Sequence, residues 1–181
     1  MASTSDPSPL VLLLGGARSG KSSLAVRWGR AYDGPVTVVA TAHAGDDEML
    51  RRIDRHRAER PTGWHTVEEP ADIERAVRDA DPRSMVIVDC LTLWVSNVLD
   101  RADADIVAAV RAFAGAARMR PSPTVAISNE VGWGIVPGDP GTRRYRDLLG
   151  EVNARVAEDA GRTLLLVAGR ALSLDAAPPT I

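Results

Sequence analysis

Residues 10–22 read LVLLLGGARSGKS and constrain the fold more than any other stretch of the chain. Residues 10–14 form an apolar run that is too short to cross a membrane, so they predict a strand buried on both faces. Residues 15–22 fit the pattern G-x-x-x-x-G-K-[ST] at every fixed position, and helix-spaced apolar residues follow them. Strand, glycine-rich loop and helix, in this order, are the context in which that pattern binds phosphate.

The chemistry of this loop explains its residue types. Glycines let the backbone turn several N–H groups toward one anion, and the helix N-terminus adds a partial positive charge. Lys21 is expected to reach the β- and γ-phosphates, and Ser22 to offer its hydroxyl to Mg²⁺. The alternative is a glycine-rich turn that only joins a strand to a helix, and it leaves the complete pattern unexplained. We therefore expect the chain to bind a nucleoside triphosphate.

Composition argues against several other classes of protein. The formal charge is −2 with acids and bases well mixed, so nucleic acid is not an expected partner. Cys90 is the only cysteine, which rules out an internal disulfide and fits a reducing cytoplasm. No apolar run approaches the roughly 18 residues of a membrane helix. We expect a cytoplasmic protein with a disordered leader over residues 1–9 and a single catalytic domain over residues 10–181.

Strands and helices alternate along the rest of the chain. The patterns predict strands at residues 35–40, 64–68, 85–89, 124–128 and 163–168, and helices at residues 46–60, 70–81, 91–99, 104–119 and 141–160. Pro70 is expected in the first turn of its helix, and the tail from Asp175 is expected to fray. The alternation predicts an α/β fold with a mainly parallel sheet covered on both faces.

Ligands of such sheets bind at the carboxyl ends of the strands. We therefore expect one crevice formed by residues 15–22, 41–45, 68–69, 89 and 129–137. Residues 129–137, NEVGWGIVP, place two glycines around a tryptophan directly after a strand. Such a loop can approach a ligand closely, although a plain crossover loop fits its composition equally well.

Asp89 ends a strand of apolar residues, as does the acid that works with Mg²⁺ beside a phosphate-binding loop. The alternative is a cap for the segment that follows, since an acid after apolar residues is common. The glycine-rich loop favours the first interpretation, so Ser22 and Asp89 are the expected Mg²⁺ ligands.

His56 has the most unusual surroundings of the histidines. Its predicted helix also carries Arg52, Arg55, Arg57 and Arg60. These charges suit a triphosphate and would keep the imidazole uncharged and nucleophilic. From the residues alone, a partly buried histidine on a basic, solvated helix is the simpler interpretation. His43 and His65 are expected to be surface or edge residues.

Several stretches together resemble one enzyme family, the bifunctional adenosylcobinamide kinase/adenosylcobinamide-phosphate guanylyltransferases of cobalamin biosynthesis. The string Asn-Glu-Val-Gly-x-Gly-Ile-Val-Pro is very specific, whereas the phosphate loop alone is not. The resemblance runs in order from about residue 11 to 174. It is carried by residues 15–22, 47–49, 52–53, 56–57, 60–61, 64, 88–92, 97, 128–132, 134–137, 146–147 and 153.

The resemblance implies a P-loop fold with a RecA-like sheet, and a homotrimer. It implies that ATP or GTP phosphorylates the hydroxyl of the aminopropanol arm of adenosylcobinamide. GTP then transfers GMP to that phosphate through a guanylylated histidine, which gives adenosylcobinamide-GDP and releases pyrophosphate. His56 matches the position of this nucleophile, which reverses the simpler interpretation above. The segment that follows Asp89 is more apolar than a lone surface helix requires, at Trp94, Val95, Val98 and Leu99. We expect part of it to lie between subunits.

Site residues follow from the motif and the resemblance together. His56 and Lys21 are the expected catalytic residues, and Glu68 and Asp89 match acids that contact nucleotide. Nucleotide contacts are expected from Gly15, Gly16, Ala17, Arg18, Ser19, Gly20, Lys21, Ser22, Ser23, Ala42, His43, Ala44, Arg57, Ala58, Glu59, Arg60, Glu68 and Asp89.

Two rival classes remain open at this point. A single-function P-loop kinase for another small molecule would keep Lys21 and Asp89 but would have no use for His56. A regulatory GTPase would need a guanine-reading Asn-Lys-x-Asp, which the sequence lacks. Residues 147–150, DLLG, fit the switch pattern D-x-x-G by letters but fall inside a predicted helix.

Overall fold

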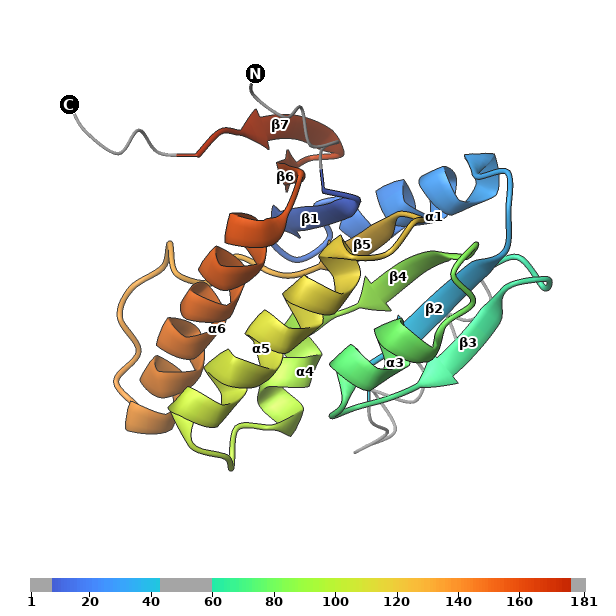
Figure 1. Ribbon diagram of the computed structural model, residues 1–181. Helices are drawn as coiled ribbons and strands as arrows, with labels where there is room; N and C mark the ends of the chain where they lie inside the picture. Colours follow the sequence, from blue (N-terminus) through green and yellow to red (C-terminus); the bar gives the residue numbers. More distant parts are fainter. Residues whose placement is uncertain (1–7, 43–59, 177–181) are drawn as a thin grey trace, which may run out of the picture.

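The computed structural model describes residues 8–42 and 60–176, and these residues form one sheet of seven strands (Figure 1). The strand order is β3-β2-β4-β5-β1-β6-β7, and every pairing is parallel except that of β6 with β7. The strands are β1 (Leu10–Gly15), β2 (Val36–Ala40), β3 (His65–Glu68), β4 (Met85–Asp89), β5 (Thr124–Ile127), β6 (Arg162–Val167) and β7 (Arg170–Leu174). β5 lies between β1, which precedes the glycine-rich loop, and β4, which ends at Asp89.

Helices cover both faces of this sheet. They are α1 (Lys21–Ala31), α3 (Ile73–Asp79), α4 (Leu91–Asn97), α5 (Asp103–Arg118) and α6 (Pro140–Asp159). α1 packs Ala25 into the apolar cluster on one face, whereas α3 to α6 form the larger cluster on the other. The predicted α/β architecture is therefore confirmed, and residues 147–150 lie inside α6 as expected.

β1 shows why the strands read as continuous apolar runs. Leu12 belongs to the cluster beneath α3 to α6, while Leu13 belongs to the cluster beneath α1, and both are fully buried. A central strand of a parallel sheet needs apolar side chains on both faces because helices cover both.

α3 begins later than predicted. Its first residue is Ile73 and its N-cap is Asp72, so Pro70 precedes the helix instead of standing in its first turn. The cause is the side chain of Glu69, whose Oε1 accepts hydrogen bonds from the amides of Ala71 and Asp72 at 3.0 and 2.9 Å. These bonds stabilise a turn ahead of the helix.

The sequence prediction omits β7, because the last strand that it predicts ends at residue 168. Val167 pairs with Arg170, so a two-residue turn joins β6 to β7 in an antiparallel hairpin. Both turn residues have positive φ, 50° at Ala168 and 75° at Gly169. Such turns favour Asn-Gly or Gly-Gly, and Ala-Gly is a weak signal for one.

α4 belongs to the core of its own subunit. Trp94, Val95 and Val98 are at most 1% exposed, and the Trp94 Nε1–H donates to the carbonyl of Ala71 at 2.8 Å. Leu99 is partly buried against the same cluster. The expectation that part of this segment lies between subunits is therefore wrong for Trp94, Val95 and Val98, whose apolar character is explained by burial within the chain itself.

Some predictions fall outside the described residues. These are the leader up to residue 7, nearly all of the helix over residues 46–60, and the last five residues of the tail. At the start of the described chain, the carbonyl of Pro9 accepts a hydrogen bond from the Thr124 amide at 3.1 Å. Among the helices that the structure describes, none has the length and apolar character that a membrane span needs.

Arg120 ties the end of α3 to the sheet and supports a first prediction. Its guanidinium donates to the carbonyls of Val77, Ala80, Asp81 and Ser84 at 2.8 to 3.2 Å, and burial lowers its pKa. Arg120→Met would leave buried carbonyls without donors, so we expect the free energy of unfolding to fall by about 2–4 kcal/mol in chemical denaturation.

A matched control is Arg118→Met, because Arg118 is exposed and, among the described residues, forms an ion pair with Asp159 at 3.6 Å. Such pairs contribute little to stability. A loss for Arg120→Met that is no larger than the loss for this control would contradict the structural role of Arg120.

Candidate nucleotide-binding site

The glycine-rich loop leaves β1 and enters α1 at the carboxyl edge of the sheet. Gly15 has a φ of 147°, and a Cβ there would lie 2.3 Å from the Leu166 carbonyl oxygen, so only glycine fits. Gly20 has a φ of 102° and is the N-cap of α1. Residues 16–18 are exposed, whereas Ser19 is 7% exposed. The loop is therefore fixed where it leaves β1 and enters α1, and residues 16–18 between these points are open to solvent.

Lys21 lies inside the curve of this loop. Its side chain is mostly buried, and Nζ donates to the carbonyls of Gly15 and Gly16 at 2.8 Å each. Ser22 and Ser23 follow in the first turn of α1, the former half-buried and the latter exposed. The structure thus brings together all the predicted positions from Gly15 to Ser23, with N–H groups of a helix N-terminus beside an ammonium group. N–H donors beside a positive charge are the chemistry that suits a phosphate group.

The turn between β6 and β7 supports the loop from outside. The Gly169 amide donates to the Ser19 carbonyl at 2.9 Å. A Cβ on Gly20 would lie 3.2 Å from the Gly169 Cα. The sequence analysis missed this contact because it depends on the hairpin, for which the pair Ala168-Gly169 was a weak local signal.

The predicted acids lie on the same edge of the sheet. Glu68 is in register with Ala40 of β2, and Ala40 is in register with Asp89 of β4. Neighbouring strands are about 4.8 Å apart, so the backbones of the two acids are about 10 Å apart. Arg60 Nη2 lies 3.7 Å from Asp89 Oδ2, and both side chains are mostly buried, at 11% and 16% exposed. Three of the predicted nucleotide contacts therefore meet at this edge.

Thr41 joins the ends of β2 and β4 beside these acids. Its Oγ1 accepts from the Cys90 amide at 2.8 Å and donates to the Cys90 carbonyl at 2.7 Å. The amide of the Asn97 side chain donates to the Thr41 carbonyl at 2.7 Å. Ala42 follows directly. Sequence analysis placed residue 41 at the crevice without this role, because the partners of Thr41 are distant in sequence.

Asn129 fixes the start of the loop that follows β5. Its amide donates to Thr92 Oγ1 at 2.8 Å, and its carbonyl accepts from the Asn153 side chain at 3.0 Å. The next amide, that of Glu130, donates to the Gly15 carbonyl at 3.3 Å. The beginning of residues 129–137 is therefore attached directly to the phosphate loop.

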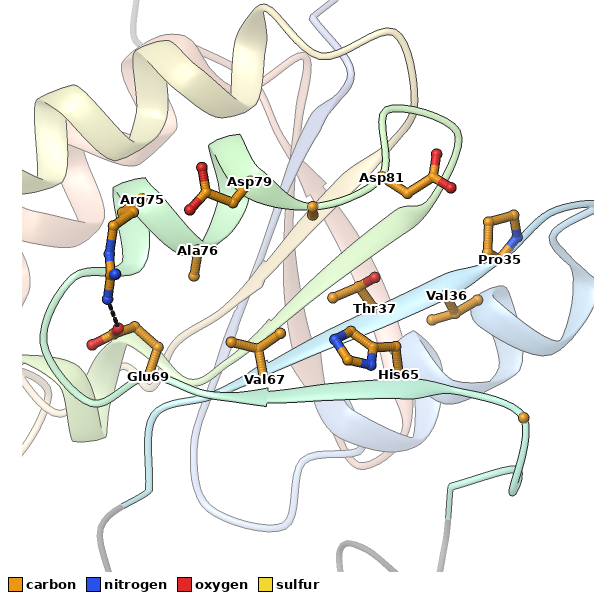
Figure 2. A pocket seen from close by; sticks show the side chains of 12 residues that line it. Pro35, Val36, Thr37, His65, Val67, Glu69, Arg75, Ala76, Asp79 and Asp81 are labelled. Carbon is orange, nitrogen blue, oxygen red and sulfur yellow. Dashed lines mark hydrogen bonds and ion pairs between the residues drawn. The ribbon is translucent and has the colours of Figure 1, made fainter.

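A cavity of about 500 Å³ lies between α3, the edge strand β3 and its neighbour β2 (Figure 2). Figure 2 shows Thr37, His65 and Val67 on the strands beneath the helix, with an ion pair between Arg75 and Glu69 of 2.7 Å at one end. Burial opposes ionisation of Glu69, but hydrogen bonds from the Asp72 and Ala71 amides and from Arg75 leave its pKa lowered. The described residues that line the cavity include none of the glycine-rich loop, and His65 is exposed as expected.

The remaining predicted site residues lie outside the described part of the chain, so their roles stay predictions. They are His43, Ala44, His56, Arg57, Ala58 and Glu59. No group of metal-binding side chains was found among the described residues. A serine hydroxyl and a carboxylate, the groups of Ser22 and Asp89, are of the kinds that suit Mg²⁺ beside phosphate oxygens, and their role as ligands stays a prediction.

The loop between β1 and α1, together with an acid at the end of β4, defines a P-loop nucleotide-binding protein. Solved structures agree on the fold. An ATPase from the type III secretion system of pathogenic bacteria matches with a TM-score of 0.56 and 14% identity, over 87% of this chain and 51% of that one. The chain therefore spans about half of that ATPase. A Pyrococcus horikoshii OT3 protein matches with a TM-score of 0.56 and 11% identity, over 91% and 84%.

Sequence comparison identifies the family. The family model for cobinamide kinase / cobinamide phosphate guanyltransferase matches residues 11–174. The bifunctional adenosylcobalamin biosynthesis protein CobP of Pseudomonas aeruginosa is 40% identical over 173 residues, which are 92% of this chain and 98% of that protein. CobU of Escherichia coli, which carries the same description, is 35% identical over 178 residues, 88% and 96% of the two chains.

The chain therefore belongs to the cobinamide kinase / cobinamide phosphate guanyltransferase family, and the resemblance seen in its motifs is confirmed. It is an enzyme of this bifunctional type. This assignment replaces both alternatives that the sequence left open, the single-function kinase and the regulatory GTPase.

Proposed function

We propose that the chain phosphorylates adenosylcobinamide and then transfers GMP from GTP to the product through a guanylylated His56, giving adenosylcobinamide-GDP. The observation that carries this proposal is the position of the two residues that flank the segment with His56. Ala42 follows β2 at the nucleotide edge, and Arg60 contacts Asp89 at the same edge. His56 precedes Arg60 by four residues, so covalent geometry limits the distance between their Cα atoms to about 15 Å.

The kinase step depends on position and charge more than on covalent help. Lys21 offers its ammonium group to the phosphates from inside the loop, and the α1 N-terminus adds N–H donors. Ser22 and Asp89 are the residues that would hold Mg²⁺, which neutralises charge on the phosphate oxygens when bound. ATP or GTP serves as phosphoryl donor. The hydroxyl oxygen of the substrate attacks the γ-phosphorus and loses its proton, while the bond from the γ-phosphorus to the β–γ bridging oxygen breaks and ADP or GDP leaves.

The guanylyl step divides one displacement into two. An uncharged imidazole nitrogen of His56 attacks the α-phosphorus of GTP, an N–P bond forms, and pyrophosphate leaves. A phosphate oxygen of adenosylcobinamide phosphate then attacks the same phosphorus, and the N–P bond breaks. Arginines near His56 in the sequence, with Arg60 beside Asp89, supply positive charge for the triphosphate.

The nucleotide contacts proposed for this site are those of the loop, residues 15–23, with Ala42, Arg60, Glu68 and Asp89 at the sheet edge. To these we add the predicted contacts of His43, Ala44 and residues 57–59. We also propose a homotrimer, which rests on the family resemblance alone, and a cytoplasmic location, which the use of ATP and GTP supports.

Product analysis tests the two-step scheme. With adenosylcobinamide and ATP alone, we expect adenosylcobinamide phosphate to accumulate, because the P-loop and its metal suffice for phosphoryl transfer. Addition of GTP is expected to convert it to adenosylcobinamide-GDP and pyrophosphate, which mass spectrometry distinguishes. Accumulation of the phosphate with no conversion when GTP is present would contradict the second activity.

A further inference from the structure

The connection between β5 and α6 carries a group of exposed apolar side chains. Trp133, Ile135 and Val136 are 76%, 97% and 61% exposed, and Val131 is 39% exposed. We call residues 131–137, VGWGIVP, the apolar loop; they include no charged side chain. Scattered exposed apolar residues need no explanation, but a contiguous group marks an interaction site.

The apolar loop is held at both ends. At its start, Glu130 donates through its amide to the Gly15 carbonyl, and its Oε1 accepts from the Gly132 amide at 2.7 Å. Beyond its end, Arg143 donates to the carbonyls of Pro137 and Gly138 at 2.9 and 2.7 Å. Figure 1 shows the connection as an orange trace that runs outside α6. The apolar loop is therefore anchored by hydrogen bonds at both ends, while its large apolar side chains are exposed.

The base of the apolar loop adjoins the place where the kinase reaction must occur. It follows β5, which lies between the strand of the phosphate loop and the strand that ends at Asp89. The second exposed apolar group, Val167 with Leu172 and Leu174, lies on β6 and β7, on the other side of β1. The cavity of Figure 2 is bordered by α3, β2 and β3, away from the phosphate loop.

We propose that the apolar loop is the surface on which the corrin ring of adenosylcobinamide docks. This inference rests on the proposed function. A corrin ring is broad and flat and bears methyl groups, so it needs an extended apolar surface. Its hydroxyl-bearing arm must also reach the terminal phosphate held at Lys21. The apolar loop satisfies both needs, and the indole of Trp133 offers a flat face for stacking.

The test compares ligand affinities of the double variant Trp133→Ser/Ile135→Ser with those of the parent protein. We expect the Kd for adenosylcobinamide, measured by equilibrium dialysis, to rise at least about tenfold, since exposed aromatic anchors dominate such contacts. The Kd for a non-hydrolysable GTP analogue should stay within about twofold. Met119→Ser is the matched control, because Met119 is 79% exposed at the end of α5 and should affect neither affinity.

Three results would overturn the inference. The first is an unchanged Kd for adenosylcobinamide in the double variant. The second is an equal or larger loss of affinity in Leu172→Ser, which would move the docking surface to β7. The third is a double variant that has a lower molecular mass by light scattering and regains its affinity for adenosylcobinamide at higher protein concentration. That result would make the loop an interface between copies of the chain.

A separate measurement distinguishes this inference from the proposed function. Attachment of GMP from α-labelled GTP, assayed without corrinoid, depends on the guanylyl site and not on ring docking. If the proposed function fails, the parent protein takes up no label, and this result does not depend on its affinity for the corrinoid. If only the docking inference fails, both proteins take label normally and bind adenosylcobinamide equally.

Discussion

Alanine in place of Lys21 is expected to slow both phosphoryl and guanylyl transfer by about 10²–10³-fold or more. Its Nζ lies within 2.8 Å of two carbonyls inside the phosphate loop, so the charge is already where phosphate oxygens would bind. Removal leaves the developing negative charge without its nearest cation. Alanine is the best helix former, so α1 should persist, and steady-state kinetics with circular dichroism on the same sample checks both points.

Arg27→Ala is the matched control for this variant. Arg27 belongs to the same helix but is exposed, away from the loop, so both rates should stay near those of the parent. Near-normal kinase turnover in a correctly folded Lys21→Ala protein would contradict the site assignment.

Lys21 is also the only lysine in the sequence. Nucleotide protection of this side chain from an amine-directed reagent, measured by peptide mapping that separates it from the N-terminal amine, therefore reports contact at Lys21.

The sequence was most informative where a functional pattern is local. Residues 15–22 are contiguous, and their glycines are fixed by backbone conformation, as the positive φ of Gly15 and Gly20 shows. The strand that ends at Asp89 was predictable for the same reason, because burial on both faces gives an uninterrupted apolar run.

Contacts between distant residues could not be predicted in this way. Thr41 binds Cys90, and Asn129 is held by Thr92 and Asn153, yet no spacing in the sequence links these partners. The start of α3 depends on hydrogen bonds to the side chain of Glu69, and helix propensities do not take such bonds into account. The helix at residues 91–99 was predicted, but the role of its apolar side chains was not, because apolar character does not distinguish a core from an interface between chains.

Alanine in place of His56 is expected to abolish attachment of GMP and guanylyl transfer while phosphorylation of adenosylcobinamide largely survives. The first activity needs an N–P bond to this imidazole, whereas the second needs the P-loop, Mg²⁺ and correct positioning. His56→Asn should fail as well, since an amide keeps hydrogen bonds but cannot form the phosphoramidate. Assays of the two half-reactions on the same preparation separate these outcomes.

Some loss of triphosphate affinity in His56→Ala is consistent with this account, because the arginines around residue 56 are expected to contact the same phosphates. Loss of both activities together would contradict the separation of roles and make His56 a residue that positions nucleotide or supports the fold. Guanylyl transfer at a normal rate would move the nucleophile elsewhere, with His43 the next candidate.

Incubation with α-labelled GTP alone tests the guanylylated intermediate most directly. After denaturation, the protein is expected to retain label that acid releases, as a phosphoramidate requires, and peptide mapping should place it on His56. GTP labelled in the γ-phosphate should leave none, because pyrophosphate departs. Absence of α-label from a protein that still makes adenosylcobinamide-GDP, or its presence on another residue, would contradict the proposed mechanism.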